Sequence, residues 1–243
     1  MNNTQHKIPG IIGGMGPEAT IDFMAKVIRK TKASCDQDHI HMLINHNPRI
    51  PNRHEAISGD PTVVGAILAE TALSLEQAGA DFLLIICNTA YAFQSHIETA
   101  CKIPLVSIID EVIGELNNQW PDVKRVGIMA AEGCLEAGLY QEALASSGKT
   151  PILWSKEEVT LFMSLVYHIK AGEPLDEISP QMAQLAQSLN AKGAEAIIMG
   201  CTEIPLVLKG GILPIPLLCS TDIMAARTLD YALGKKVPDI FNI

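Results

Sequence analysis

Short apolar runs alternate along the chain with longer segments whose apolar positions follow helical spacing. This alternation is typical of a parallel sheet whose strands are joined by crossover helices. Several runs are almost continuously apolar, as expected when helices cover both faces of the sheet. The pattern therefore predicts an α/β fold with strands at Ile8–Ile12, His39–Ile44, Phe82–Ile86, Leu105–Ile108, Arg125–Met129, Pro151–Trp154, Ala196–Met199 and Ile215–Cys219.

Two of the predicted helices carry signals at both ends. In the first, Asp60 can cap the helix, Pro61 suits its first turn, and Gly79 can end it. In the second, Ser179–Pro180 supplies the opening and Gly193 the end. Each of these two helices is followed by an almost wholly apolar strand, so the two segments have the same expected structure.

The chain repeats itself in two places. The stretch GADFLLIICNTAY at Gly79–Tyr91 has a counterpart, GAEAIIMGCTEIP, at Gly193–Pro205. A second pair, IPLVSIID at Ile103–Asp110 and IPLLCSTD at Ile215–Asp222, places an Asp where it can cap a helix. The shared features lie 112 to 114 positions apart, which indicates two equivalent halves. Because each Ile-Pro strand is a plausible crossover, we expect one lobe from residues 1–104 plus 215–243 and a second from residues 105–214.

Cys87 and Cys201 occupy equivalent positions at the carboxyl ends of two predicted strands. Ligands of open α/β sheets collect at these strand ends, so two facing halves would bring both cysteines to one cleft. Each cysteine precedes a predicted helix N-terminus, where the dipole and free N–H groups favour a thiolate. A lone cysteine at a strand end is most simply a small core residue. Two at matching positions, each followed by polar residues, favour chemistry.

Stereoinversion is the chemistry that a pair of opposed thiols suits best. A metal site usually needs three or four ligands, and no third residue is spaced with these cysteines. A cysteine hydrolase uses one nucleophile beside a base, with no use for a duplicated thiol. In stereoinversion, one thiolate removes a proton from a carbon and the opposite thiol returns a proton to the far face.

The composition limits the kinds of partner that the protein can bind and the cell compartment in which we expect it. The 243 residues carry a formal net charge of −9 and no cluster of Lys and Arg, which argues against a nucleic-acid partner. No apolar run is long enough to span a bilayer, and the start MNNTQHKIPG does not resemble a signal peptide. The six cysteines lack CxxC spacing. We therefore expect a cytoplasmic protein with free thiols that acts on a small molecule.

The motifs resemble those of a known family. The stretches GIIGGMGPEAT, NHNPRIPNR, CNTAY and GCTEIP occur in the order and approximate spacing of the aspartate/glutamate racemases, and are most similar to the aspartate racemase branch. The resemblance covers nearly the whole chain. It implies two pseudo-symmetric, Rossmann-like α/β lobes with mostly parallel sheets and the active site between them. It further implies a cofactor-independent racemase that is commonly a homodimer.

The resemblance also implies roles for individual residues. Cys87 and Cys201 match the two acid–base residues of the family. The cysteine that matches Cys201 is associated there with deprotonation of the L-enantiomer, and its counterpart with the D-enantiomer. Asn88, Thr89 and Thr202 match residues that hold the α-carboxylate and α-ammonium groups.

Three charged residues complete the implied site. Glu203 lies next to the second cysteine motif. Arg53 matches an arginine of the NPxxPxR stretch, and Lys170 matches a lysine of a KAG segment. Both cations would bind the substrate's side-chain carboxylate, for which the guanidinium fork is well shaped. On residue type alone, both would be solvated surface cations.

The sequence departs from the family pattern at two positions. Cys134 stands where a TxGT loop of the second half often has Thr, which puts one ligand hydrogen bond in doubt. Tyr91 stands where the branch usually has His. Neither change removes a predicted proton carrier.

The glycine-rich segment Gly14–Ala19 matches the G-x-G-x-x-A fingerprint of dinucleotide-binding loops. However, Asp36 and Asp38 precede the next predicted strand rather than end it, which does not suit ribose recognition. We expect Gly16 instead to let backbone N–H groups approach an amino-acid carboxylate, with Met15 filling space beside the ligand.

The sequence thus predicts a cofactor-independent racemase that interconverts L- and D-aspartate, with glutamate as a slower substrate. Two alternatives stay open. A hydantoin racemase or another isomerase of the superfamily would keep the cysteine pair, although Arg53 and Lys170 favour a dicarboxylic substrate. A non-catalytic amino-acid sensor would use the same cleft with Cys87 and Cys201 as spectators.

Overall fold

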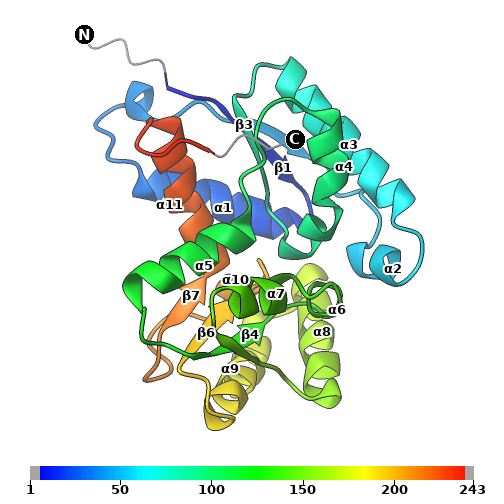
Figure 1. Ribbon diagram of the computed structural model, residues 1–243, viewed down its shortest axis with the longest axis vertical. Helices are drawn as coiled ribbons and strands as arrows, with labels where there is room; N and C mark the ends of the chain where they lie inside the picture. The colour runs from blue at the N-terminus through cyan, green and yellow to red at the C-terminus, as the bar shows by residue number, and fades with distance from the viewer. Residues whose placement is uncertain (1–5, 239–243) are drawn as a thin grey trace.

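The protein folds into two lobes, each built on an all-parallel sheet (Figure 1). The computed structural model describes residues 6–238. Its strands are β1 (Pro9–Gly13), β2 (Leu43–His46), β3 (Phe82–Ile85), β4 (Arg125–Met129), β5 (Thr150–Ile152), β6 (Ala196–Met199) and β7 (Leu217–Cys219). The first sheet has the order β2-β1-β3 and the second the order β5-β4-β6-β7. The predicted α/β fold with two parallel sheets is confirmed.

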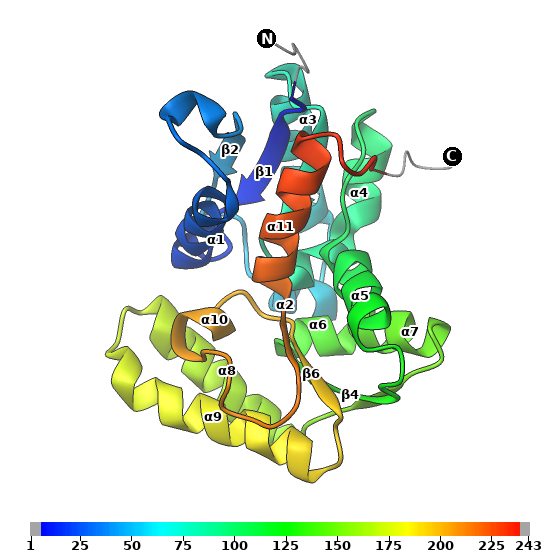
Figure 2. The ribbon, with the colours of Figure 1, turned by 90° about the vertical axis from the view of Figure 1, so that its left-hand side faces the viewer.

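Helices cover both faces of each sheet. They are α1 (Pro17–Lys30), α2 (Arg53–Ser58), α3 (Thr62–Gln77), α4 (Gln94–Ala100), α5 (Ile108–Gln119), α6 (Glu132–Glu136), α7 (Leu139–Ser146), α8 (Lys156–Lys170), α9 (Leu175–Ala191), α10 (Ile204–Val207) and α11 (Ser220–Ala232), with 3-10 helices η1 (Asp36–Asp38) and η2 (Asn88–Phe93). In the first lobe α3 and α4 lie on one face and α1 and α11 on the other; in the second, α8 and α9 lie opposite α5 and α7 (Figures 1 and 2).

The apolar core of the first lobe continues into the second. Ile11 of β1 belongs to the same cluster of buried side chains as Ile128 of β4 and Tyr140 and Leu144 of α7. A separate cluster, which includes Trp154, fills the space between the second sheet and α8 and α9. Because one core runs through both lobes, the seam between them is a packed interface rather than a loose linker.

The sequence repeat appears in the structure as equivalent hydrogen bonds. The N–H of Leu83 in β3 donates to the carbonyl oxygen of Pro104 at 2.8 Å. At the matching place in the second lobe, the N–H of Ile197 in β6 donates to the carbonyl oxygen of Pro216 at 2.9 Å. Each Ile-Pro segment therefore lies beside the strand that leads to one of the repeated cysteines.

Acidic side chains brace both sheets at matching positions. Asp81 accepts a hydrogen bond from the N–H of Ile8 at 2.6 Å, where β1 is about to begin. Glu195, 114 positions later, accepts from the N–H groups of Lys124 at 2.7 Å and Arg125 at 3.0 Å, where β4 begins. These bonds satisfy donors that would otherwise lack partners at the start of a strand.

The strand pairing departs from the expected lobe boundary at two places. Leu105, expected in the second lobe, forms a parallel bridge with Leu83 of the first sheet. β7, expected in the first lobe, pairs with β6 of the second sheet. The chain passes between the lobes after these segments and not before them. α5, which follows Leu105, packs on α7 of the second lobe, and α11, which follows β7, packs on α1 of the first lobe (Figure 2). Residues 1–5 and 239–243 of the expected first lobe lie outside the described residues.

Four of the predicted strands differ from the observed ones by only one or two residues at an end, and three predicted elements differ by more. The predicted helix opening at Ser179–Pro180 is wrong, because α9 begins at Leu175 and Pro180 lies inside it. Pro180 is near enough to the start that its missing N–H removes only an early helical bond. The strand predicted at His39–Ile44 begins at Leu43 instead, and residues 39–42 are irregular. The strand predicted at Leu105–Ile108 shrinks to the single bridge.

The caps of the repeated helices also differ from expectation. Ser107 caps α5 and accepts a hydrogen bond from the N–H of Asp110, which lies in the first turn. Asp222 likewise lies in the first turn of α11, after Cys219 at the cap position. Each Asp therefore complements the helix dipole from within the first turn instead of capping it.

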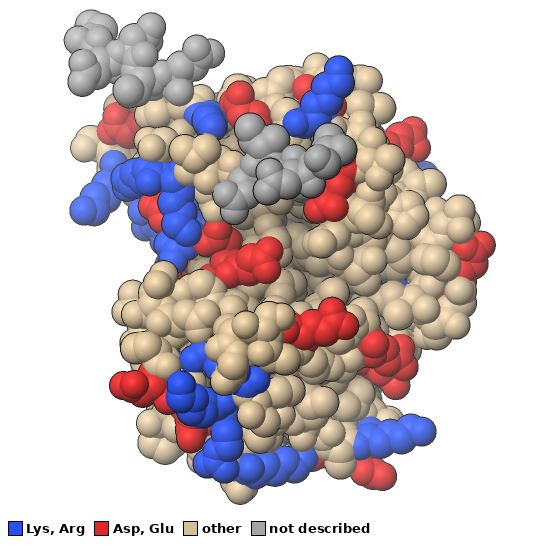
Figure 3. All heavy atoms as spheres, viewed as in Figure 1, with Lys and Arg blue, Asp and Glu red and all other residues tan. Residues whose placement is uncertain are grey.

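The surface carries mixed charge. Wherever Lys and Arg side chains gather on the face shown in Figure 3, acidic side chains lie beside them. Among residues 6–238, no helix combines the length and the apolar character that a bilayer span requires.

We expect Gly14→Ala to destabilise the protein more than Gly79→Ala. Both glycines have positive φ, 92° at Gly14 and 99° at Gly79, so either Ala introduces about 1 kcal/mol of backbone strain. At Gly14 an added Cβ would lie 2.5 Å from the carbonyl carbon of Asn47, whereas at Gly79 nothing lies within 4 Å. The clash should add about 1 kcal/mol or more to the loss of unfolding free energy, measured by urea denaturation. Equal losses would contradict this account.

Candidate active site

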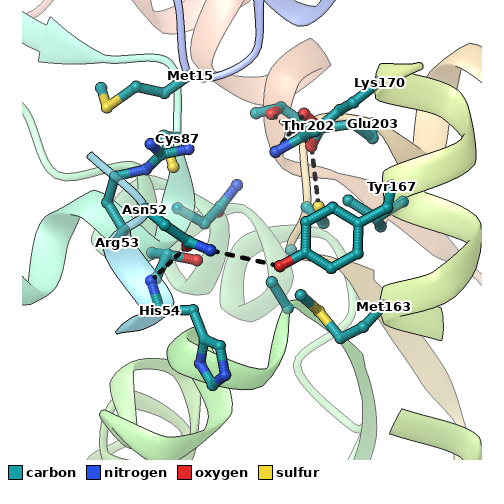
Figure 4. A pocket seen from close by; sticks show the side chains of 16 residues that line it. Met15, Asn52, Arg53, His54, Cys87, Met163, Tyr167, Lys170, Thr202 and Glu203 are labelled. Atoms are coloured by element: carbon teal, nitrogen blue, oxygen red, sulfur yellow. Dashed lines mark hydrogen bonds and ion pairs between the residues drawn. The ribbon is translucent and has the colours of Figure 1, made fainter. Parts of the chain in front are cut away.

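A pocket of about 260 Å³ lies between the lobes, at the carboxyl ends of β3 and β6 (Figure 4). Both lobes contribute to its walls, as expected for a sheet-end site. The residues that line it are Met15, Asn52, Arg53, His54, Cys87, Asn88, Thr89, Ala131, Met163, Val166, Tyr167, Lys170, Gly200, Cys201, Thr202 and Glu203.

Most of the residues singled out from the sequence lie in this pocket. Those that line it are Met15, Arg53, Cys87, Asn88, Thr89, Lys170, Cys201, Thr202 and Glu203. Gly16 does not; it lines a neighbouring cavity of about 60 Å³ that shares Lys170 and Glu203 with the main pocket. Cys134 is fully buried in α6 and is not among the lining residues.

The two cysteines enter the pocket from equivalent places. Cys87 lies two residues after the end of β3 and Cys201 two residues after the end of β6. Both residues are mostly buried, with 8% and 7% of their surface exposed. The repeat therefore brings one thiol from each lobe to a single cavity.

Glu203 governs the electrostatics around Cys201. The Cys201 thiol donates to Oε2 of Glu203 at 3.1 Å, and the hydroxyl of Thr202 donates to the same oxygen at 3.2 Å. Burial, and then the charge of Glu203, raise the pKa of Cys201 well above its usual value. The expected stabilisation of a Cys201 thiolate is therefore wrong, because burial and the nearby carboxylate of Glu203 disfavour the charged form and the helix that follows, α10, is only four residues long.

Lys170 neutralises part of this negative charge. Its Nζ lies 3.4 Å from Oε1 of Glu203, whose side chain is buried, while the lysine side chain is partly exposed. Burial opposes the charged form of Lys170, but the attraction of Glu203, Cys201 and Cys87 outweighs it and raises the lysine pKa. Lys170 is therefore a cation in the pocket, already paired with a carboxylate.

Arg53 provides a second cation from the other lobe. It begins α2, and its Nη1 donates to the carbonyl oxygens of Ile50 at 3.0 Å and Pro51 at 2.9 Å. Its Nε is buried and has no hydrogen-bond partner within residues 6–238. Arg53 and Cys87 both line the pocket (Figure 4). The side chain is thus held by one nitrogen and retains donors for a ligand.

Asn88 is bound to the protein at both ends of its amide. Oδ1 accepts from the hydroxyl of Tyr140 at 2.6 Å, and Nδ2 donates to Oγ of Ser220 at 3.3 Å. Asn88 is also 3% exposed and lines the pocket. Since Nδ2 carries two hydrogens, one N–H remains for a ligand.

The sequence interpretation missed one wall of the pocket. Met163, Val166 and Tyr167 lie on the same face of α8 as Lys170, which they precede by seven, four and three residues. That spacing is the signal that would have identified them. The amide of Asn52 reaches across the cavity to the hydroxyl of Tyr167 at 3.4 Å (Figure 4).

His54 also lines the pocket and connects the two lobes. Its Nε2 lies 3.0 Å from Glu132 and its Nδ1 lies 3.6 Å from Glu136, both on α6. Among the described residues, no three His, Cys, Asp or Glu side chains are placed to share a metal ion. His54 therefore acts in the structure as a link across the pocket rim.

The two departures from the family pattern lie outside the pocket. Burial, and then the charge of Cys87, raise the pKa of Cys134 far above its usual range. Tyr91 is 2% exposed; its hydroxyl donates to the carbonyl oxygen of Val106 at 2.8 Å and accepts from the N–H of Ile85. Tyr91 thus stabilises the first lobe, and neither side chain lines the cavity.

Two parallel-sheet lobes that share one pocket form the fold of the solved aspartate and glutamate racemases. Residues 12–228 match the Asp/Glu/hydantoin racemase family. The chain belongs to this family.

Relatives of known name agree with this assignment. The broad specificity amino-acid racemase RacX of Bacillus subtilis is 27% identical over 229 residues, which cover 93% of this chain and 98% of the relative. The structure of Picrophilus torridus aspartate racemase superimposes with a TM-score of 0.83 and 25% identity over 93% of this chain and 94% of that one. The structure of an aspartate racemase homologue from Pyrococcus horikoshii superimposes with a TM-score of 0.73. It is 25% identical, and the match covers 93% of this chain and 99% of that one.

We expect Glu203→Gln to speed alkylation of Cys201 by iodoacetamide at pH 8. Removing the carboxylate charge lowers the raised pKa of Cys201, so more of the reactive thiolate is present at this pH and the rate should rise by about tenfold. Peptide mass spectrometry would follow both pocket thiols, with Glu195→Gln as the matched variant. An unchanged or slower Cys201 rate would contradict the electrostatic role of Glu203.

Proposed function

We propose that the protein interconverts L- and D-aspartate without a cofactor, with glutamate as a slower substrate. One observation carries this proposal: Cys87 and Cys201, from equivalent strand ends, line one pocket together with Arg53 and Lys170. Racemisation needs a base and an acid on opposite faces of one carbon, and a dicarboxylic substrate needs local cations. The similarity to an aspartate racemase over most of the chain supports the same substrate class.

In the proposed reaction the two thiols exchange roles with direction. From L to D, Cys201 as thiolate removes the α-proton and the thiol of Cys87 returns a proton to the other face. From D to L the two cysteines act in reverse. Glu203 is placed to accept the Cys201 proton first, because its Oε2 lies 3.1 Å from the sulfur. Since the pKa of Cys201 is raised, its thiolate is costly to form but strongly basic once formed.

The remaining pocket residues would hold the substrate. Asn88, Thr89 and Thr202 bind the α-carboxylate and α-ammonium groups through their hydrogen-bonding side chains. Arg53 and Lys170 bind the side-chain carboxylate, and the free donors of Arg53 suit it for the larger share because Lys170 is already paired with Glu203. Bound carboxylate would draw Lys170 partly away from Glu203.

The cellular setting follows the same proposal. The two thiols provide a proton path that requires no pyridoxal phosphate as an electron sink. All six cysteines are free, which agrees with a reducing, cytoplasmic compartment. We also propose a homodimer, as the family resemblance implies.

Two other functions would use the same cleft, and experiments can distinguish each of them from an aspartate racemase. A hydantoin racemase would keep the cysteines, but its neutral ring would leave Arg53 without a carboxylate partner. An amino-acid sensor would bind a ligand and never exchange its α-proton. The resemblance to a broad specificity racemase makes a panel of amino acids the appropriate substrate screen.

We expect Cys87→Ser and Cys201→Ser each to lower racemisation of L-aspartate by about 100-fold or more, because a serine hydroxyl is a poor proton carrier at neutral pH. Proton NMR in deuterium oxide would measure α-deuteration, and chiral chromatography would measure D-aspartate, with no added cofactor. Cys101→Ser, a buried thiol outside the pocket, should retain activity. Racemisation that survives both substitutions would refute the mechanism, and binding without exchange would indicate a sensor.

We expect Arg53→Ala to lower kcat/KM for L-aspartate by about 10- to 100-fold, the loss typical of a charge-assisted hydrogen bond. α-Deuteration of L-alanine, which has no side-chain carboxylate, should change far less. Arg49→Ala removes an exposed arginine four residues earlier and serves as the matched control. Equal losses for aspartate and alanine would show that Arg53 does not recognise the side chain.

A further inference from the structure

Tyr140 lies outside the lining of the pocket, yet it touches the chain beside each of the two cysteines. Its hydroxyl donates to Oδ1 of Asn88, the residue after Cys87, at 2.6 Å. Its ring packs against Gly200, the residue before Cys201, where an added Cβ would lie only 2.6 Å from Cε2 of the tyrosine. One side chain on α7 thus contacts both cysteine-bearing loops.

The hydrogen bonds around Tyr140 form a chain with a fixed direction. The carbonyl oxygen of Met199 can only accept, so the Ser220 hydroxyl must donate to it, at 2.8 Å. Oγ of Ser220 therefore accepts from Nδ2 of Asn88. This leaves Oδ1 of Asn88 as the acceptor for Tyr140. The chain fixes which end of the Asn88 amide faces which partner.

This chain joins the two lobes at the level of the thiols. Asn88 begins η2 after β3, and Met199 ends β6. Tyr140 comes from α7, and Ser220 begins α11. Tyr140 and Ser220 are 0% exposed and Asn88 is 3% exposed. Because water has little access to these atoms, a lost member leaves a buried polar group without a partner. These contacts hold the segments around Asn88 and Gly200 at a fixed separation.

The geometry points to Tyr140, acting with Ser220, as a positioning residue that sets the spacing of the two thiols and directs the free N–H of Asn88 toward the substrate. This inference rests on the proposed racemase function and adds to it two residues that do not line the pocket. Two-base catalysis is sensitive to such spacing, because a misplacement of about 1 Å between reacting groups can cost about 100-fold in rate.

Tyr91 provides a matched control for the loss of a buried tyrosine hydroxyl. It is 2% exposed, and its hydroxyl makes two hydrogen bonds to the main chain. Both partners, Ile85 and Val106, are main-chain groups of the first lobe, and none of the three residues lines the pocket. Tyr91→Phe should therefore lower Tm without changing the separation of the thiols.

The test compares Tyr140→Phe with Tyr91→Phe. We expect Tyr140→Phe to lower kcat about 10- to 100-fold in both the L-to-D and D-to-L directions, with KM changed less than about threefold. Tyr91→Phe should keep kcat within about threefold of the unaltered protein, with a comparable fall in Tm. If Tyr140→Phe also keeps kcat, or if both variants lose kcat in proportion to Tm, Tyr140 is only structural and the proposal is wrong.

Ser220→Ala removes the serine hydroxyl from the hydrogen-bond chain that joins Tyr140, Asn88 and Ser220. If Tyr140 and Ser220 both act through Asn88, the double variant should lose about as much kcat as the worse single variant, not the product of the two losses. Multiplicative losses would show that the two residues act independently, which would overturn the inference that both act through Asn88.

The failure of this inference is distinguishable from failure of the proposed function. If the unaltered protein exchanges the α-proton of no amino acid tested, the racemase proposal fails. The packing of the two cysteine-bearing segments is then tested by the iodoacetamide alkylation rates of Cys87 and Cys201, which rise when a thiol becomes more exposed. We expect both rates to rise several-fold in Tyr140→Phe and to stay unchanged in Tyr91→Phe. Identical rates in the two variants would overturn the positioning role.

Discussion

The two parallel sheets point their carboxyl ends toward one seam, and the apolar core that crosses this seam fixes how far apart those ends lie. Buried side chains of β1, β4 and α7 belong to one cluster, so the lobes share packing instead of meeting through a flexible linker. Every feature of the pocket depends on this constraint, because each lobe alone supplies only one thiol and one of the two cations.

Within the seam, polar groups are arranged in two connected sets. Around Cys201, Glu203 joins the thiol, Thr202 and Lys170 in one charged cluster. Beside Cys87, Asn88 is held by Tyr140 and Ser220. The halves are thus alike in backbone and unlike in chemistry. A carboxylate faces the thiol of Cys201, whereas an amide follows Cys87 in the chain.

The two halves also exchange helices in the same way. Each Ile-Pro segment stays with the sheet of its own half, as the matching hydrogen bonds at Pro104 and Pro216 show. The helix that follows then crosses the seam, so that α5 and α11 pack on each other at the interface (Figure 2). This exchange ties each lobe to its partner through the main chain as well as through the core.

The sequence by itself determined the alternation of strands and helices, the repeat, and the placement of Cys87 and Cys201 at strand ends, because periodicity and punctuation are local properties. It also indicated most of the pocket residues through the family motifs. Only the tertiary structure decided that Cys201 faces Glu203, that β7 stays with the second sheet, and that Tyr167 and Tyr140 approach the site. Those outcomes depend on burial and on contacts between residues far apart in the chain, which no local pattern records.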